Sequence, residues 1–581
     1  MANMEAWQFN RDILDDLCAA VERERSIATE KASEWQPVRN ALLSSGSSGA
    51  TLLKAEDIDE QLKEGSTTVI RIDGKKFIAE VVGMAFGELD LLIKNCDLIS
   101  GLKVEYRIPF DDYLTTLYDF LQGKVFEVNS DKFPKSSLAL ANAVVSPLGN
   151  RKAAGSRVSY VMGAPGSGKT EELVQKALAL VFSGMRVMVV TYTNAAADII
   201  FGRLASRLAD EPSVQLARLG LTEASLEIEK RADSDNVRST MAIAQAMEGN
   251  LMVTTAYRAL MCAKNEVGTH SVVLFDEAST LPISLAWAGS LVATERIVLY
   301  GDPFQLGPIG QSEPLREHTL RQRFATSPFE IEGVMKAAEA DQSQVVLQRQ
   351  YRLPSALANA TCPPLYQTSI NSTRNLLNDT QSPWGVGSLL YVDSSKLEAT
   401  CQKTQRGSRR NEIHADLVVE LVRAMLEQEV VAADDIAKSL LIITPYRAQR
   451  SLISNRLEET RWIAKMQIRA LVTTVHRAQG SEREYVILDV TDAPNFDRDV
   501  FLPVGRLWEG EGLQSNGSRL LNTALTRARK QALVVLHRDF IRNSSAVRSG
   551  IVKALPSLND KLDRWGMPAT IKFDSPESKE C

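Results

Sequence analysis

The chain has 581 residues, a net charge of −5 and a pI of about 5.8. With 44% hydrophobic and 24% charged residues, the composition is that of a globular protein with several domains. An acidic chain is not a basic coat for nucleic acid, although a narrow binding channel stays compatible with this charge. No apolar run approaches the roughly 18 residues of a membrane-spanning helix, and no secretory signal is visible, so we expect a cytoplasmic protein with no membrane partner. The six cysteines and five histidines are dispersed, so we expect neither a disulfide framework nor a zinc site.

The N-terminal part predicts a helix, a small β-barrel and a second helix. Residues 1–48 carry apolar residues at helical spacing and end in a Ser/Gly stretch typical of a linker. This helix is either a docking stalk or a helix that packs on the next domain. Residues 49–109 contain short strand patterns, including a hairpin signal at Asp73-Gly74, and predict the barrel. Residues 110–135 return to a helical pattern and a linker.

A phosphate-binding loop follows. From Gly163 the sequence reads Gly-Ala-Pro-Gly-Ser-Gly-Lys-Thr, which is the P-loop pattern, between an apolar strand and a helical segment. Glycines at 163, 166 and 168 let backbone N–H groups face an anion, and the next helix adds its N-terminal partial charge. Lys169 is then expected to reach the β- and γ-phosphates, and the hydroxyl of Thr170 to hold Mg²⁺.

Apolar strands alternate with helical stretches from residue 155 onward, which predicts an α/β fold with parallel sheets covered on both faces. We expect two such units in tandem, over residues 136–340 and 341–556, followed by a loose tail over 557–581. The mixed, charged segment 205–248 reads as a surface insertion of the first unit. The strand at Val345–Leu347 is assigned to the second unit.

Acidic and basic side chains follow these strands. Asp276 and Glu277 end an apolar strand, where the first acid can orient Mg²⁺ and the second can activate water. Gln305, after the next strand, can sense the γ-phosphate through its amide. Arg352 and Arg527 lie in the second unit, and each can stabilise the charge of a transferring phosphoryl group.

Nine segments in order now carry a resemblance to a family. They are GAPGSGKT (163–170), TYTNAAAD (191–198), VTTAYRA (253–259), LFDEAS (274–279), GDPFQLGP (301–308), LQRQYRLP (347–354), LIITPYRAQ (441–449), TTVHRAQGSE (473–482) and LNTALTRARK (521–530). Together they resemble the superfamily 1 helicases, in the 5′-to-3′ branch of the nonsense-mediated-decay helicase and the helicases of plus-strand RNA viruses. Only residues 450–472 separate PYRAQ from TTVHRAQG, too few for the domain that other branches insert there.

The resemblance implies two tandem RecA-like domains and a role for each matching residue. The catalytic group is Asp276, Glu277, Gln305, Arg352 and Arg527, with Thr170 and Asp276 at Mg²⁺. The nucleotide-binding group is Gly163, Gly166, Ser167, Gly168, Lys169, Thr170, Tyr351, Gly480 and Glu482. The nucleic-acid-binding group is Asn194, Thr255, Pro445, Tyr446 and Thr474.

The implied activity is an NTP-dependent helicase, with ATP as substrate, moving 5′ to 3′ on single-stranded RNA or DNA. The barrel is then expected to split or grip the duplex. An NTP-driven remodelling factor that does not unwind duplex would carry the same motifs, and the intact acids and arginines argue against an inactive scaffold. The family reads adenine with a glutamine upstream of the P-loop, and the stretch at 136–142 offers none, which leaves the preferred base open.

Overall fold

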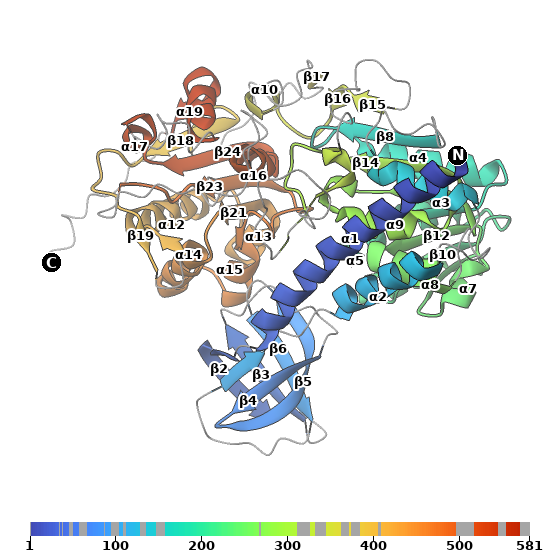
Figure 1. Ribbon diagram of the computed structural model, residues 1–581. Helices are drawn as coiled ribbons and strands as arrows, with labels where there is room; N and C mark the ends of the chain where they lie inside the picture. The colour runs from blue at the N-terminus through green and yellow to red at the C-terminus, as the bar shows by residue number, and fades with distance from the viewer. Residues whose placement is uncertain are drawn as a thin grey trace, which may run out of the picture. The chain divides into compact units, whose positions relative to one another are not determined.

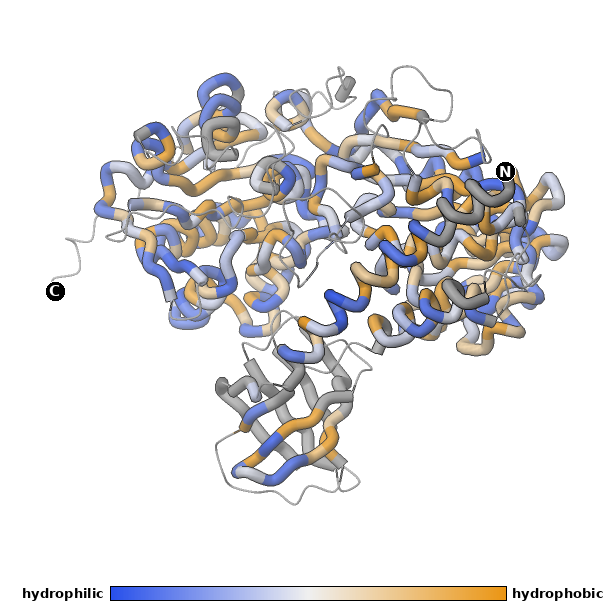
Figure 2. The backbone as a smooth tube through the Cα atoms, in the orientation of Figure 1, coloured by the Kyte–Doolittle hydropathy of each residue, from blue (hydrophilic) through white to orange (hydrophobic). Residues whose placement is uncertain are grey.

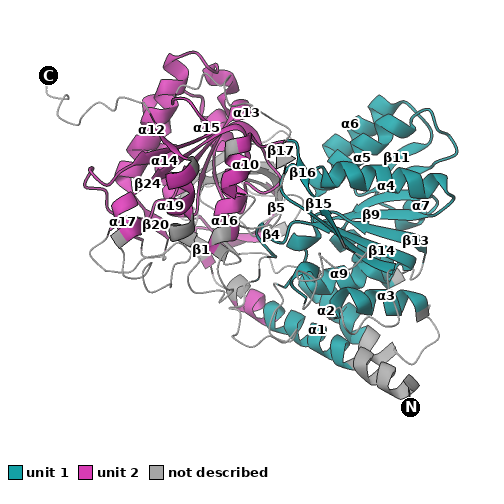
Figure 3. Ribbon diagram, turned by 90° about the horizontal axis from the view of Figure 1, so that it is seen from above, with its two compact units in different colours: residues 1–25, 112–351, 368–371 teal, residues 26–111, 352–367, 372–581 magenta. Residues whose placement is uncertain are grey.

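The computed structural model describes residues 2–33, 35–37, 39–45, 50–56, 67–85, 88–94, 104–107, 112–127, 135–146, 157–265, 269–308, 310, 326–331, 344–361, 371–372, 384–404, 408–494, 516–543 and 554–569. Its contacts divide the chain into two compact units (Figure 3). Unit 1 comprises residues 1–25, 112–351 and 368–371, and unit 2 comprises residues 26–111, 352–367 and 372–581. Among the described helices, none combines the length and the apolar character needed to cross a membrane.

The N-terminal helix α1 (Ala2–Ser33) buries the predicted apolar stripe, including Leu14, Leu17 and Val21. It ends earlier than the predicted stalk, because strands begin at Trp35. The Ser/Gly stretch lies between two strands of one sheet and is not a linker between domains. Helix α2 (Asp112–Glu127) supplies Gln122, whose amide lies 3.4 Å from the sulfur of Cys18 on α1.

The predicted β-barrel is confirmed (Figure 1). Its strands are β1 (Trp35–Pro37), β2 (Arg39–Ser45), β3 (Ala50–Glu56), β4 (Thr67–Ile72), β5 (Lys75–Ala85), β6 (Glu88–Lys94) and β7 (Val104–Arg107). They pair antiparallel in the order β1-β7-β4-β5-β6-β3-β2. The first and last strands of this order are separated by position 38 alone, so the sheet returns on itself. Asp73 and Gly74 make the β4–β5 turn with φ values of 45° and 86°, as a type I′ hairpin needs.

Unit 1 is built on an eight-stranded parallel sheet in the order β11-β10-β12-β9-β13-β14-β8-β15. The strands are β8 (Val158–Gly163), β9 (Val187–Thr191), β10 (Leu216–Leu219), β11 (Val237–Thr240), β12 (Leu251–Thr255), β13 (His270–Phe275), β14 (Ala293–Gly301) and β15 (Gln344–Leu347). The helices are α3 (Lys135–Val145), α4 (Lys169–Phe182), α5 (Asn194–Leu208), α6 (Glu223–Ala232), α7 (Ile243–Met247), α8 (Ala256–Asn265) and α9 (Ile283–Ser290). Apolar side chains of α4, α5 and the central strands form a continuous core. Figure 2 colours the backbone by hydropathy and shows hydrophobic (orange) stretches throughout this unit.

Two predictions about unit 1 are wrong. The segment 205–248 is not a surface insertion, because it supplies β10 and β11, which extend the parallel sheet beyond β12. Strand β15 does not belong to the second sheet, since it pairs with β8 beside the P-loop, with Leu347 opposite Gly163. Both errors arise because sequence order does not reveal which neighbours a strand pairs with.

The sheet of unit 2 has six strands in the order β22-β21-β23-β24-β18-β25. The strands are β18 (Leu389–Asp393), β21 (Leu440–Thr444), β22 (Val472–Thr474), β23 (Arg483–Asp489), β24 (Ala528–Leu536) and β25 (Met567–Pro568), with the short strands β19 (Gln402–Lys403) and β20 (Arg409–Arg410) elsewhere in the unit. The short strand β16 (Arg349–Gln350) lies in unit 1, and β17 (Asn371–Ser372) spans the boundary between residues 371 and 372. The helices are α10 (Ser355–Thr361), α12 (Glu412–Glu427), α13 (Ile436–Ser439), α14 (Arg447–Thr460), α15 (Lys465–Leu471), α16 (Asn516–Leu525), α17 (Arg538–Asn543) and α19 (Ala554–Trp565). Apolar residues of α12, α14 and the strands form its core.

The two parallel sheets confirm the predicted α/β class with tandem P-loop-type units. The predicted tail over 557–581 is partly structured, because α19 continues to Trp565 and β25 pairs with β18. Residues 570–581 lie outside the described residues.

Candidate nucleotide and nucleic-acid sites

The P-loop joins β8 to α4 and has the geometry of an anion cradle. Gly166 and Gly168 have φ values of 77° and 86°, in the region that side chains disfavour. A Cβ on Gly163 would lie 2.2 Å from Oγ of Ser167 and 3.2 Å from Cβ of Leu347, so the loop has no room for a larger residue there. Helix α4 starts at Lys169 and directs its N-terminal N–H groups to the loop.

Two polar side chains line this loop. The ammonium of Lys169 donates to the carbonyl oxygens of Gly163 at 2.7 Å and Ala164 at 3.2 Å. The hydroxyl of Ser167 is buried and has no hydrogen-bond partner among the described residues. A buried hydroxyl of this kind is costly unless a ligand satisfies it, which fits a phosphate in the loop.

Thr170 and Asp276 make a pair of oxygen ligands beside the loop. The hydroxyl of Thr170 donates to Oδ2 of Asp276 at 3.1 Å, which joins the first turn of α4 to the end of β13. Burial raises the pKa of Asp276, while the nearby ammonium of Lys169 and hydrogen bonds from Glu277 and Thr170 oppose that rise. A hydroxyl next to a carboxylate is the donor set that Mg²⁺ prefers, so these residues fit the expected metal.

Glu277 has a different environment from its neighbour. Its backbone adopts a left-handed conformation with φ of 51°, which is uncommon for a residue with a side chain. The N–H of Glu277 donates to Oδ1 of Asp276 at 3.0 Å, and its carbonyl accepts from the hydroxyl of Thr280 at 2.8 Å. These contacts hold the backbone of Glu277, and of the two consecutive acidic residues Asp276 is buried while Glu277 is partly exposed.

Gln305 is linked to the same strand end through Asp302. Its amide donates to Oδ2 of Asp302 at 2.8 Å, and the N–H of Asp302 donates to Oγ of Ser279 at 3.1 Å. The segments DEAS and GDPFQ are therefore joined by direct hydrogen bonds. A displacement of the acidic strand end would therefore also displace Gln305 through these hydrogen bonds.

Tyr351 follows β15 in the chain and contacts the P-loop. Its N–H donates to the carbonyl of Gly166 at 2.8 Å. Its ring is 54% exposed, and a Cβ on Gly168 would lie 3.9 Å from one ring carbon. An exposed aromatic face beside a phosphate cradle is suited to stacking on a nucleobase.

Two predicted arginines of unit 2 contact the segment Gly480–Glu482. Arg352 forms an ion pair with Glu482. Arg527 is buried, and its guanidinium donates to the carbonyl of Thr523 at 2.9 Å and to that of Ser481 at 3.4 Å. Both arginines therefore contact the segment that the resemblance assigns to nucleotide binding.

The predicted nucleic-acid residues lie at the carboxyl ends of parallel strands, the edge where open α/β sheets bind ligands. Thr255 ends β12, and Asn194 begins α5 immediately after β9. Pro445 and Tyr446 follow β21, and Thr474 ends β22. Asn194 and Thr255 therefore form one group in unit 1, and Pro445, Tyr446 and Thr474 form a second group in unit 2.

Two buried polar networks behind these residues were missed in the sequence. In unit 1, Arg218 is fully buried and donates to Oδ1 of Asn194 at 3.0 Å and to Oδ1 of Asp198 at 2.9 Å. The side-chain oxygen of Asn194 is thus already occupied within the protein. An arginine inside the apolar strand Leu216–Leu219 was the only sequence signal of this network.

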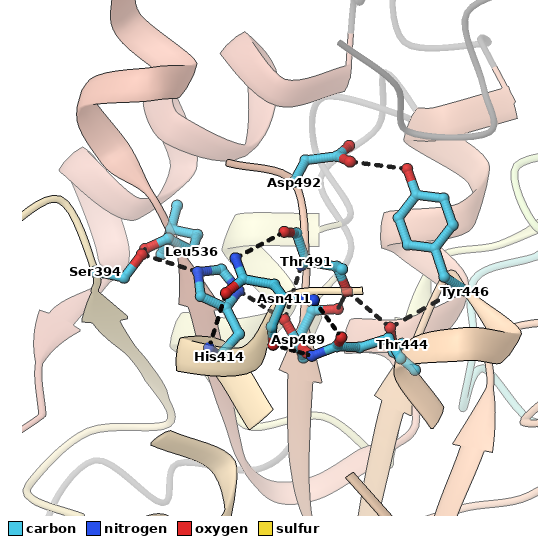
Figure 4. A network of polar contacts seen from close by, with 10 residues as sticks. Ser394, Asn411, His414, Thr444, Tyr446, Asp489, Thr491, Asp492 and Leu536 are labelled. Atoms are coloured by element: carbon cyan, nitrogen blue, oxygen red, sulfur yellow. Dashed lines mark hydrogen bonds and ion pairs between the residues drawn. The ribbon is translucent and has the colours of Figure 1, made fainter. Parts of the chain in front are cut away.

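The second network lies in unit 2 and contains a serine, a histidine and an aspartate in a row (Figure 4). Ser394 Oγ lies 2.8 Å from Nε2 of His414, whose Nδ1 lies 2.9 Å from Oδ1 of Asp489. The geometry matches a hydrolase triad, but all three residues have 0% exposure, so no substrate reaches the serine. Ser394 directly follows β18, His414 lies on α12 and Asp489 ends β23, and no local pattern connects them.

Residues 150–358 match one protein family described as an AAA domain, and residues 326–539 match a second family with the same description. The DNA replication ATP-dependent helicase/nuclease JHS1 of Arabidopsis thaliana is 24% identical over 431 residues, which cover 68% of this chain and 29% of the relative. The human DNA replication ATP-dependent helicase/nuclease DNA2 is 24% identical, with 77% of this chain and 43% of the relative covered.

A regulator of nonsense transcripts 1 homolog from Arabidopsis thaliana is 25% identical over 288 residues, which cover 48% of this chain and 20% of that protein. Among solved structures, the arterivirus nonstructural protein 10 helicase aligns with 90% of this chain and 82% of its own, at 15% identity and a TM-score of 0.40. The chain spans less than half the length of these three curated relatives.

Proposed function

We propose that this chain, which belongs to the superfamily 1 helicases, hydrolyses a nucleoside triphosphate in order to move along a nucleic acid strand. The observation that carries the proposal is the nucleotide site of unit 1. There the phosphate cradle, the ammonium of Lys169 and the Thr170–Asp276 oxygen pair lie together. Those groups bind triphosphate and Mg²⁺ in P-loop enzymes. ATP is the proposed substrate, because the similar DNA replication helicases are described as ATP-dependent.

In this proposal each residue of the cradle has a separate task. The loop N–H groups and Lys169 bind the phosphates, and Thr170 with Asp276 would hold Mg²⁺, which supplies positive charge to the phosphate oxygens when bound. Glu277 takes a proton from the attacking water, because its carboxylate is more exposed than that of Asp276 and its backbone is fixed. Gln305 links the γ-phosphate to the sheet through Asp302.

Arg352 and Arg527 are proposed to stabilise the transferring phosphoryl group. Their matching positions in the family motifs support this role, as does their joint contact with Gly480–Glu482. Arg352 would have to leave Glu482 in order to bind phosphate. Nucleotide binding would then release Glu482 to contact the ribose, and the two events would be coupled.

The nucleic-acid strand is proposed to cross the carboxyl ends of the strands in each unit, with movement 5′ to 3′. Asn194, Thr255, Pro445, Tyr446 and Thr474 occupy those ends. Relatives described as DNA replication helicases and as regulators of nonsense transcripts make single-stranded DNA and RNA the two candidate partners. A cytoplasmic location, with no membrane partner, is proposed from the sequence alone.

The test measures NTP hydrolysis by the full chain with no nucleic acid, with single-stranded DNA and with single-stranded RNA of the same sequence. We expect one strand type to accelerate turnover, and Lys169→Ala to abolish turnover in all three conditions. A strand-displacement assay with a 5′ overhang and a 3′ overhang then reads unwinding and direction. Equal hydrolysis with and without strands would contradict the motor. Stimulated hydrolysis without displacement would favour a remodelling factor.

A further inference from the structure

The crevice between β21 and β23 is the topological switch point of the unit 2 sheet. Strand β21 continues through α14 to β22 on one side, whereas β23 continues through α16 to β24 on the other side. Right-handed crossovers in opposite directions place the two helices on opposite faces, and Figure 1 shows α12 and α14 on one face and α16 and α19 on the other. The loops after β21 and β23 therefore separate here, which is where open α/β sheets bind ligands.

Two hydrogen bonds connect these separating loops (Figure 4). The hydroxyl of Tyr446, after β21, donates to Oδ1 of Asp492, after β23, at 2.8 Å. The hydroxyls of Thr444 and Thr491 lie 3.0 Å apart. Tyr446 is 6% exposed and Asp492 is 2% exposed, so both side chains are buried at the switch point and the tyrosine does not face solvent. Its neighbours in the chain, Pro445 and Arg447, are more exposed.

The loop that carries Asp492 is held in a strained conformation. Thr491 has φ of 69°, a left-handed value that is a clear outlier for a β-branched residue and costs on the order of a few kcal/mol. Four contacts hold it there. Its N–H donates to Oδ1 of Asp489 at 2.7 Å, its carbonyl accepts from Nδ2 of Asn411 at 3.0 Å, and its hydroxyl lies 3.0 Å from that of Thr444 and 3.4 Å from the carbonyl of Asp489. Strain that the surroundings maintain in this way is typical of ligand sites.

The side chain of Asp492 accepts a hydrogen bond from Tyr446 through one of its two oxygens. Its second oxygen, Oδ2, is buried without a hydrogen-bond partner among the described residues. Burial raises the pKa of Asp492 well above its usual range, although the hydrogen bond from Tyr446 and the charge of Arg409 oppose that rise. The contact between the two loops therefore depends on the accepting oxygen Oδ1, whether or not the carboxyl is charged.

We propose that Tyr446 and Asp492 form a positioning pair, which fixes the Pro445–Arg447 loop so that unit 2 binds a single strand of nucleic acid. The inference rests on the proposed function. It adds that the side chain of Tyr446 acts as an anchor inside the crevice, while the exposed loop around it contacts the strand. Without the anchor the Pro445–Arg447 loop is mobile, and ordering it when the strand binds costs conformational entropy, which weakens binding.

The experiment compares Tyr446→Phe, Asp492→Ala and Asp492→Asn in the full chain. It measures the concentration of single-stranded oligothymidylate or oligouridylate that gives half-maximal stimulation of NTP hydrolysis, and the affinity of the same oligonucleotide by fluorescence anisotropy. Loss of the hydrogen bond in Tyr446→Phe and Asp492→Ala should raise the half-stimulating concentration about tenfold. Asp492→Asn keeps an accepting oxygen and should stay within about twofold of wild type. The KM for NTP should not change in the three variants.

The matched control is Tyr391→Phe. Tyr391 lies on β18, and its hydroxyl accepts a hydrogen bond from Arg538 at 3.0 Å, away from the crevice. This variant loses a tyrosine hydrogen bond in the same unit and should keep the wild-type half-stimulating concentration. A purely structural role for Tyr446 would lower the maximal rate or the melting temperature without changing that concentration. That result, or a wild-type value for Tyr446→Phe, overturns the positioning pair. If wild-type protein neither binds the strand nor responds to it, the proposed function itself fails and the pair fails with it.

Discussion

Asp276 and Glu277 have different protein environments although they are adjacent in the chain. Asp276 is buried against Thr170 and Lys169, while Glu277 is partly exposed and held by its backbone in a left-handed conformation. A buried carboxylate next to a hydroxyl suits metal binding, and a more exposed carboxylate suits proton transfer from water. The strand end therefore separates two tasks between two consecutive residues.

Glu277→Gln should bind nucleotide with near wild-type affinity and lose hydrolysis by about 10²-fold or more, because the amide cannot accept the proton of the attacking water. Single-turnover hydrolysis and equilibrium binding of a fluorescent nucleotide separate the two effects. Glu227→Gln, an exposed residue on α6 that pairs with Arg231, is the control. Undiminished hydrolysis by Glu277→Gln would remove the base assignment.

His270 makes the stability of unit 1 depend on pH. This side chain is fully buried at the start of β13, and burial, followed by the charge of Arg186, lowers its pKa from 6.5 to about 3. The unfolded chain binds a proton below pH 6.5 and the folded chain does not, so stability decreases as the pH falls from about 6.5 towards 3. At pH 5 the 1.5-unit interval corresponds to about 2 kcal/mol.

Chemical denaturation at pH 7.5 and pH 5 checks this value. His270→Gln cannot take up a proton, so its free energy of unfolding should change less between the two pH values than that of wild type. The variant also loses packing at both pH values, which cancels in the difference. An identical pH dependence in wild type and variant would assign the effect to other groups.

At the scale of elements, β15 restricts the size of the residue at Gly163. Because β15 pairs with β8, Cβ of Leu347 lies 3.2 Å from the position of a Cβ on Gly163, and Ser167 approaches from the other side. Four residues after the end of β15, the N–H of Tyr351 donates to the carbonyl of Gly166. The edge strand thus packs against the loop, and the segment that follows it places an aromatic residue beside the loop.

Gly163→Ala should weaken nucleotide binding by at least about tenfold, because the methyl group overlaps Ser167 and displaces the loop from its anion-binding shape. Equilibrium binding of a fluorescent nucleotide measures the loss. Gly123→Ala is the control, since its helix α2 has nothing within 4 Å of the added methyl group. That control should bind nucleotide normally and gain up to about 1 kcal/mol of stability.

Sequence patterns predicted most elements but not their partners. The P-loop, the acidic strand end and the Asp73-Gly74 hairpin depend on local residues, and each was found from local residues. The places of β10, β11 and β15 depend on pairing between distant segments, which periodicity does not encode. The left-handed Thr491 was also not predictable, because contacts from three other elements enforce it.

At the scale of the whole molecule, the barrel is the domain whose function the sequence motifs say least about. It is an antiparallel fold of seven strands, whereas the two large sheets of the chain are parallel, and it contains none of the nine family segments. A domain outside the nucleotide and strand motifs can alter what the motor does without altering the hydrolysis step. We therefore propose that the barrel separates or grips the duplex.

Replacing residues 34–111 by a short Gly/Ser linker should preserve hydrolysis without nucleic acid and abolish strand displacement, because the P-loop residues and both proposed arginines lie outside the replaced segment. The two rates are measured on the same preparation, with circular dichroism as the check on folding. Strand displacement at the wild-type rate would show that the barrel has another task.

The contacts of Asp489 restrict which substitutions this sequence can accept during evolution. Its carboxylate serves His414 and, at 2.6 Å and 2.7 Å, Gln449 and Thr491, all without exposure to water. Changing Asp489 alone would leave the donors of His414 and Gln449 buried without an acceptor, and changing either of those two would leave a carboxylate oxygen short of a donor, at a cost of about 1–3 kcal/mol. The contact from Thr491 comes from its backbone N–H and does not depend on its side chain. We therefore expect relatives to replace the side chains of Asp489, His414 and Gln449 together or to keep all three. An alignment in which they vary independently of one another would contradict this expectation.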